Sequence, residues 1–209
     1  MRIAVLGTGD VGGALGKRWA AKGHQVIFGS RHPGSNDVRE LLAEAGPNAK
    51  ATGYAQAVQA ADVNVLAVPW NAARPVLESV ADWTGRVLVD CTNPITPDMQ
   101  LAVGTTTSAA EQIAGWAQGA YVVKAFNTTG WNNMVDPIYH GERITMFICG
   151  DNAESKAIVT NLAEDLGFEV VDAGDLTAAR YLEPLAMLWI DLAIGQKLGR
   201  DVAFKLVRR

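Results

Sequence analysis

Residues 2–12 read RIAVLGTGDVG, and this stretch decides the fold. The apolar run 3–6 predicts a short buried strand, and the spacing of Val11, Leu15 and Trp19 predicts a helix directly after it. Between them the glycines follow the pattern G-x-G-x-x-G. The first glycine permits a tight turn, the second lets the backbone approach a pyrophosphate, and the third lets the helix pack on the strand. The stretch therefore predicts a dinucleotide site of the Rossmann type.

The rest of the chain alternates between apolar runs and helical patterns. Strands are expected at 25–28, 63–68, 87–89, 121–126, 144–148 and 169–171, and helices at 11–22, 38–45, 54–61, 71–81, 108–117, 153–166 and 176–198. This alternation predicts an α/β fold, a Rossmann-type doubly wound and mostly parallel sheet with right-handed crossovers. We expect residues 1–150 to form the cofactor-binding domain. Residues 151–209 should form a short C-terminal α/β extension on the same sheet, because about 60 residues make a marginal core alone.

Composition excludes several classes of function. The chain has 209 residues and a net charge of −4, with 18 basic and 22 acidic residues, which disfavours a nucleic-acid partner. Its two cysteines, Cys91 and Cys149, lie far apart, so neither a metal site nor a disulfide scaffold is expected. The most apolar stretch, 181–195, contains two acidic residues and is too short to cross a membrane. We expect a cytoplasmic protein.

The end of the second strand selects the form of the cofactor. An NAD-binding protein usually carries Asp or Glu there to hold the ribose 2′-hydroxyl. This chain has Ser30 and Arg31 instead, followed by His32. A guanidinium matches phosphate oxygens bidentately and can stack on adenine. The sequence therefore predicts NADP(H) and makes residues 1–150 an NADP-binding domain.

Further candidates follow later strands, because ligands of open parallel sheets bind at the carboxyl ends of the strands. We expect Asn127, the one candidate catalytic residue, to bond the nicotinamide carboxamide or a substrate carbonyl. Asn is also common in turns for local reasons, and Trp70 is equally explained by packing over the following helix. The expected cofactor-binding residues are Gly7, Thr8, Gly9, Asp10, Val11, Gly12, Ser30, Arg31, Val68, Pro69, Trp70, Asn93, Pro94, Ala125 and Asn127.

Over nearly its whole length the chain resembles the NADP oxidoreductases that use the deazaflavin coenzyme F420. The matching stretches are residues 2–9, 29–31, 68–70, 123–128, 150–151 and 172–174. The motif KAFNT at 124–128 also looks like that of the cytosolic NADPH domain of membrane metalloreductases, which pass hydride to a flavin.

The resemblance implies positions for the parts of the cofactor. It places the pyrophosphate on residues 8–11, the 2′-phosphate on Ser30 and Arg31, and the nicotinamide end beside residues 68–69, Asn93 and Asn127. It also implies a deazaflavin over the nicotinamide, with the segment 173–185 closing the acceptor site. The chain departs from the archaeal deazaflavin enzymes at 124–131, where the bulky Trp131 would narrow or reshape the acceptor pocket.

We therefore expect an NADP(H)-dependent oxidoreductase that transfers hydride between NADP(H) and a flavin or deazaflavin-type acceptor, F420, FMN or FAD. Such a reaction needs no general acid, because the cofactors supply the chemistry and the protein positions them. Two alternatives stay open: reduction of a small imine or carbonyl substrate, and a non-enzymatic NADP(H) sensor. Whether His140 has a catalytic role also stays open, and the Glu183 carboxylate could either cap backbone groups or line the acceptor site.

The helix expected at 176–198 is apolar on more than one side, as Leu182, Leu185, Trp189 and Leu192 show. Such a helix is usually buried on several sides. One side should cover the sheet, and another is expected to meet a second copy in a homodimer. The alternative is a core formed within one chain.

Overall fold

The glycine-rich motif connects the first strand, β1 (Arg2–Leu6), to the first helix, α1 (Asp10–Ala21), in the computed structural model, which describes residues 1–209. Eight strands form one sheet in the order β10-β9-β6-β5-β4-β1-β2-β3. The other strands of the sheet are β2 (Gln25–Gly29), β3 (Ala49–Thr52), β4 (Val63–Leu66), β5 (Val87–Asp90), β6 (Tyr121–Lys124), β9 (Thr145–Gly150) and β10 (Glu169–Asp172).

Six of these strands, β1 to β6, are parallel, and their order reverses between β1 and β4. This confirms the prediction of a Rossmann-type, mostly parallel sheet. β9 runs antiparallel to β6, with Cys149 opposite Lys124, and β10 is parallel to β9. The strand ends that follow β1, β2, β4, β5 and β6 therefore share one edge of the sheet.

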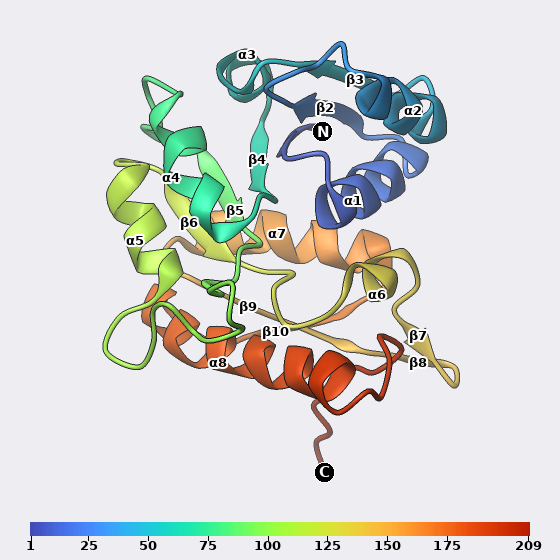
Figure 1. Ribbon diagram of the computed structural model, residues 1–209, viewed down its shortest axis with the longest axis vertical. Helices are drawn as coiled ribbons and strands as arrows, with labels where there is room; N and C mark the ends of the chain where they lie inside the picture. Colours follow the sequence, from blue (N-terminus) through green and yellow to red (C-terminus); the bar gives the residue numbers. More distant parts are fainter.

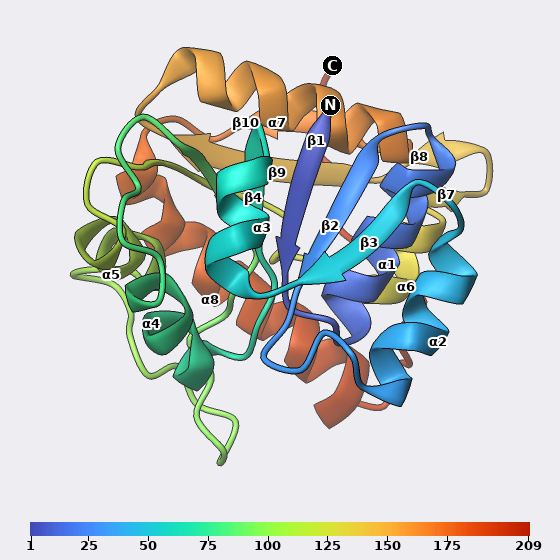
Figure 2. The same cartoon turned by 90° about the horizontal axis from the view of Figure 1, so that it is seen from above.

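Helices cover both faces of the sheet. Figure 2 shows α3, α4 and α5 on one side of the strands and α1 and α2 on the other. The core of the α1 side contains Trp19, Phe28 and Phe126, and the opposite core contains Leu66 and Leu88. The helices after α1 are α2 (Asn36–Ala45), α3 (Tyr54–Ala60), α4 (Trp70–Glu78), α5 (Ala109–Trp116), α6 (Trp131–Val135), α7 (Ala153–Leu166) and α8 (Ala179–Ile190).

Three features differ from the sequence-based expectation. β3 was not predicted, because its residues Ala-Lys-Ala-Thr have little strand propensity and pair only along the edge of the sheet. The short α6 and the hairpin of β7 (Ile138–Tyr139) and β8 (Glu142–Arg143) were also not predicted. The helix expected at 176–198 consists of a 3-10 turn at Leu176–Ala178, α8, and a π-turn at Asp191–Gly195.

α8 crosses the molecule beside the ends of β5 and β6 (Figure 1). Its buried side carries Leu182, Ala186 and Trp189. The chain after the π-turn has no regular structure, and Trp189 Nε1 donates to the carbonyl of Val202 at 2.7 Å. No helix combines the length and apolarity that a membrane span requires.

Candidate functional site

The three glycines of the motif differ in how strictly the backbone at each position requires glycine. Gly7 has a φ of +124°, and a Cβ there would lie 2.2 Å from the carbonyl oxygen of Ala67. A Cβ at Gly12 would lie 2.2 Å from the oxygen of Gly7. A Cβ at Gly9 would meet nothing within 4 Å, and its φ of −80° suits any residue. The fold therefore requires Gly7 and Gly12, whereas open space lies in front of Gly9.

The N-terminus of α1 faces this space. Gly9 is the N-cap, with no side-chain hydrogen bond to the helix. The first amides of an α-helix have no intrahelical acceptor, and the helix dipole places partial positive charge there. Asp10, Val11 and Gly12 form this first turn. Backbone N–H groups beside unfilled space are what a pyrophosphate binds, so these residues fit a dinucleotide.

A cleft of about 960 Å³ opens from this loop, at the edge where the strand order reverses. Seven of the sequence-predicted residues line it: Gly7, Thr8, Gly9, Ser30, Arg31, Val68 and Pro69. One face of α4 also lines the cleft, with residues at helical spacing, and so does the first turn of α2. The lining residues that sequence reasoning missed include Ser35, Asp37, Tyr54, Asn71, Ala72, Pro75, Val76 and Ser79.

The loop after β2 presents a free cation to the cleft. Arg31 is exposed and makes no hydrogen bond or ion pair within the chain, while Ser30 Oγ accepts a hydrogen bond from the amide of His32 at 3.1 Å. Ser35, the N-cap of α2, makes no side-chain capping bond. The loop thus offers a guanidinium, hydroxyls and the start of a helix on one side of the cleft, a set that suits a phosphate.

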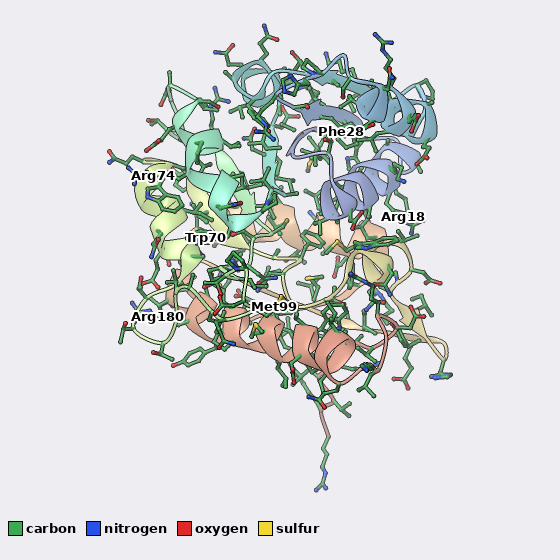
Figure 3. All side chains as sticks on the ribbon, in the orientation of Figure 1. Arg18, Phe28, Trp70, Arg74, Met99 and Arg180 are labelled. Carbon is green, nitrogen blue, oxygen red and sulfur yellow. The ribbon has the colours of Figure 1, made fainter.

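Trp70 lies apart from the cleft. Its ring stacks on Trp116 of α5, with centroids 5.2 Å apart and planes inclined by 29°, and the Arg74 guanidinium lies 5.8 Å from the Trp116 ring. Figure 3 shows Trp70 and Arg74 on the α4–α5 side of the molecule. This is the packing alternative that the sequence left open.

Asn93 and Asn127 meet at the ends of β5 and β6. Asn93 Nδ2 donates to the carbonyl of Asn127 at 2.9 Å, and Asn127 Nδ2 donates to Asn93 Oδ1 at 3.2 Å and to the carbonyl of Leu182 at 3.1 Å. Asn93 is half-buried and Asn127 is 3% exposed. Asn127 Oδ1 is buried without a partner. Pro94 and Ala125 beside them are also buried.

The residue before Asn127 has an unusual backbone conformation. Phe126 has a φ of +62°, a region that bulky residues rarely adopt. Its ring packs edge-on against Trp19 and Phe168, with centroids 5.8 and 6.2 Å away. Its amide donates to the Met146 sulfur at 3.1 Å. Strain of this kind persists where surrounding packing imposes it, typically at functional sites.

Below the two amides lies a buried cluster of three charged side chains: Lys124, Asp90 and Glu183. Lys124 Nζ lies 2.8 Å from Asp90 Oδ2, 3.0 Å from Glu183 Oε1 and 2.6 Å from the carbonyl oxygen of Thr92. Burial by itself would lower the pKa of Lys124, but the charges of Asp90 and Glu183 outweigh it and raise that pKa. The lysine therefore stays charged inside the protein.

Glu183 also binds the start of α5. Its two oxygens accept from the amides of Ala109 at 2.9 Å and Ala110 at 3.1 Å. Of the two roles that the sequence left open for Glu183, capping of backbone groups is therefore the observed one. Sequence reasoning missed Lys124 and Asp90, and their placement as the last residues of neighbouring strands was the available signal.

A second pocket, of about 500 Å³, lies between the loop after β5 and α8. Met99, which Figure 3 shows beside α8, forms one wall with Gln100 and Leu101. The other wall is formed by Pro184, Met187, Leu188 and Asp191. The pocket is mostly apolar with one carboxylate at its end, a surface that suits a flat ring with a hydrogen-bond donor.

The chain offers no evident nucleophile or metal site. Burial raises the pKa of the Cys149 thiol to about 12 and also raises that of Cys91, so both are neutral thiols. His140 lies in the exposed turn between β7 and β8. No group of three or more acidic, histidine or cysteine side chains is arranged to hold a metal. The arrangement suits binding and orientation of ligands.

Comparison with known proteins shows the family to which the chain belongs. Residues 2–94 match the family model described as NADP oxidoreductase coenzyme F420-dependent. The chain is 30% identical to the F420-dependent NADP reductase of Methanothermobacter thermautotrophicus, over 95% of this chain and 91% of that protein. It is 33% identical to the rat metalloreductase STEAP3, over 90% of this chain but only 37% of that protein. A crystal structure of a candidate F420-dependent NADP reductase from an Arthrobacter species superposes with a TM-score of 0.89, at 33% identity and 99% coverage of each chain.

Proposed function

Since the chain belongs to the family of F420-dependent NADP oxidoreductases, we propose that it transfers hydride between NADP(H) and a deazaflavin-type ring. That it is an NADP-dependent oxidoreductase follows from the family. The observation that supports binding of NADP(H) is the unfilled space at Gly9, beside a cleft that is also lined by Ser30 and Arg31.

The cleft supports a definite placement of NADP(H). The pyrophosphate lies on the first turn of α1, above Gly9, and the 2′-phosphate lies between Ser30 and Arg31. The adenine then meets the α4 face of Ala72, Pro75 and Val76. Because Arg31 has no partner in the chain, its guanidinium is free to form a bidentate contact with phosphate oxygens.

The nicotinamide end lies over the strand ends that carry Val68, Pro69 and Asn93. Asn127 is buried, so it acts through its neighbour: its two hydrogen bonds with Asn93 hold that half-buried amide in one orientation. Bound NADPH supplies the hydride, and the protein's share is to hold the two rings in contact and to exclude water.

The acceptor ring is assigned to the second pocket, between Met99 and α8. Apolar walls suit a flat ring, and Asp191 can accept a hydrogen bond from a ring N–H. In this proposal residues 151–209 form an extension that supplies one wall of the pocket. FMN and FAD carry a related ring and are the alternative acceptors.

The test is oxidation of NADPH, followed at the nicotinamide absorbance, with separate acceptors. These are F420, FMN, FAD, riboflavin, a ferric chelate and a cyclic imine. We expect turnover with F420 or a flavin and a preference for NADPH over NADH. Turnover with only the imine would overturn the acceptor assignment, and tight NADPH binding with no turnover would favour a sensor.

We also propose that α8 joins two copies of the chain. Its outer side exposes Tyr181 by 78%, and Ile194 of the π-turn is 50% exposed; neither residue lines the second pocket. Exposed apolar residues gathered along one helix favour a symmetric interface with a second copy of that helix.

A further inference from the structure

In the buried cluster of Lys124, Asp90 and Glu183, every proton of the Lys124 ammonium has an acceptor. The Lys124 ammonium has three protons and three acceptors, and Glu183 accepts from Lys124, Ala109 and Ala110. The side chains of Lys124 and Asp90 have no exposed surface, and that of Glu183 is 1% exposed. Apolar residues of similar volume often replace buried ion pairs at no cost in stability. Stability alone therefore does not account for the cluster.

The cluster does fix the relative position of four elements. Asp90 and Lys124 end β5 and β6, Ala109 and Ala110 begin α5, and Glu183 belongs to α8. A second contact lies one residue away, where the Leu182 carbonyl accepts from Asn127 Nδ2. α8 is thus anchored to the strand ends at two successive residues.

The anchor lies directly beside the second pocket. Pro184 follows Glu183, and the same wall continues with Met187 and Leu188 of α8 and with Asp191 of the π-turn. α8 continues as a helix from Glu183 to Ile190 with a rise of about 1.5 Å per residue, so a displacement at Glu183 is carried to Met187 one turn further on. The opposite wall, from Met99 to Leu101, belongs to the loop that follows β5. The distance between the walls depends on how α8 sits on the strand ends.

We propose that Lys124 and Glu183 are positioning residues that set the width of the acceptor pocket, by holding α8 against the ends of β5 and β6. The inference rests on the proposed function, which assigns the acceptor ring to this pocket. Neither side chain touches a ligand. Both act through the wall that α8 supplies.

Glu183→Gln is the sharpest single change. All three partners of Glu183 are donors: Lys124 Nζ and the amides of Ala109 and Ala110. A carboxylate offers two acceptor oxygens, whereas glutamine offers one and turns an NH₂ group toward a donor. Side-chain volume is kept, so the variant changes the anchor without opening a cavity.

Glu111→Gln is the matched control. Glu111 also joins α5 to α8, through Arg180 at 2.6 Å, but this pair is partly exposed to solvent. The substitution is chemically the same and removes a contact between the same two helices. It leaves the anchor at Lys124 intact.

The experiment titrates each protein with FMN and with F420, following the fluorescence of the ring, and separately with NADPH. Glu183→Gln should weaken ring binding about tenfold, a change of about 1.4 kcal/mol. NADPH affinity should stay within about twofold, because the residues assigned to its phosphates and its adenine lie on other elements. Hydrogen exchange of residues 184–191 should be faster in Glu183→Gln. Glu111→Gln should match the wild type in both affinities, and its exchange at residues 184–191 should rise less than that of Glu183→Gln.

Unchanged ring binding in a folded Glu183→Gln protein would overturn the proposal, as would an equal loss of ring and NADPH binding. If Glu183→Gln does not fold, the neutral triple variant D90N/K124M/E183Q, which leaves no buried charge unpaired, takes its place with the same expected results. If the wild type binds neither ring, the proposed function fails. The anchoring of α8 is then judged by the exchange of residues 184–191 alone, where no difference between the two Gln variants would refute it.

Discussion

A methyl group added at Gly9 would meet no atom of the chain within 4 Å. Gly9→Ala should therefore change the free energy of unfolding by less than about 0.5 kcal/mol. The methyl would occupy the space assigned to the pyrophosphate, so the NADPH dissociation constant should rise at least about tenfold. Thermal unfolding and a fluorescence titration with NADPH measure the two effects.

The control for this change is Gly115→Ala in α5, where an added Cβ also meets nothing within 4 Å. That variant lies outside the cleft and should bind NADPH as the wild type does. Because alanine favours a helix, its stability should rise by up to about 1 kcal/mol. Wild-type NADPH affinity in Gly9→Ala would show that the pyrophosphate does not lie on this loop.

Arg31 is exposed and unpaired in the chain, so its removal should leave stability unchanged. A hydrogen bond to a charged group contributes about 1.5–3 kcal/mol. Arg31→Ala should therefore weaken NADPH about tenfold to a hundredfold and leave NADH affinity unaltered, as measured by parallel titrations. Arg39→Ala, an exposed arginine of α2 outside the cleft, is the control. Equal losses for the two cofactors would refute 2′-phosphate recognition.

At the scale of elements, two helix N-caps should behave differently. Asn152 Oδ1 accepts from the amide of Ser155 at 2.8 Å and caps α7, so Asn152→Ala should cost about 1 kcal/mol of stability. Ser35 at the start of α2 makes no capping bond and faces the cleft. Ser35→Ala should cost little stability but weaken NADPH severalfold. Urea unfolding and NADPH titration of both variants would show whether the two effects separate.

The contact between α5 and α8 through Glu111 should titrate in acid. Hydrogen bonds from Arg180 lower the pKa of Glu111 below its ordinary value of 4.5. A carboxyl whose pKa is lower in the folded state adds stability above the unfolded pKa and loses it as the pH falls. Glu111→Gln should therefore be less stable than the wild type at pH 7, and the difference should shrink as the pH falls below about 4.5. A difference that persists unchanged at pH 3 in urea unfolding would contradict this.

The sequence predicted most elements because their signals are local. Apolar runs and the glycine spacing of residues 7–12 determine where β1 ends and α1 begins. β3 has no such signal, since its alanines and lysine are held by pairing with β2. Local sequence patterns could not predict the buried cluster either, because Lys124 and Glu183 are brought together by the fold and not by their spacing.

At the scale of the whole molecule, parallel strands explain why the site is compact. The glycine loop and the amide pair follow strands that end at one edge of the sheet, and Asp90 and Lys124 of the buried cluster are the last residues of two of these strands. α8 lies across the ends of β5 and β6 and presents its buried side to them (Figure 1). Its outer side lines the second pocket and also exposes Tyr181 and Ile194, which do not line it and which we propose contact a second copy.

That outer side gives the last prediction. Ile194 is 50% exposed and does not line the second pocket, so Ile194→Glu should disrupt a dimer without touching the acceptor wall. Sedimentation velocity should show the wild type at twice the 22.2 kDa of one chain and the variant at the mass of one chain. NADPH affinity should be the same in both, because the cleft lies on other elements. Val207→Glu, at a 78% exposed position in the C-terminal tail, should stay dimeric. A wild type that sediments as a single chain at every concentration would refute the interface.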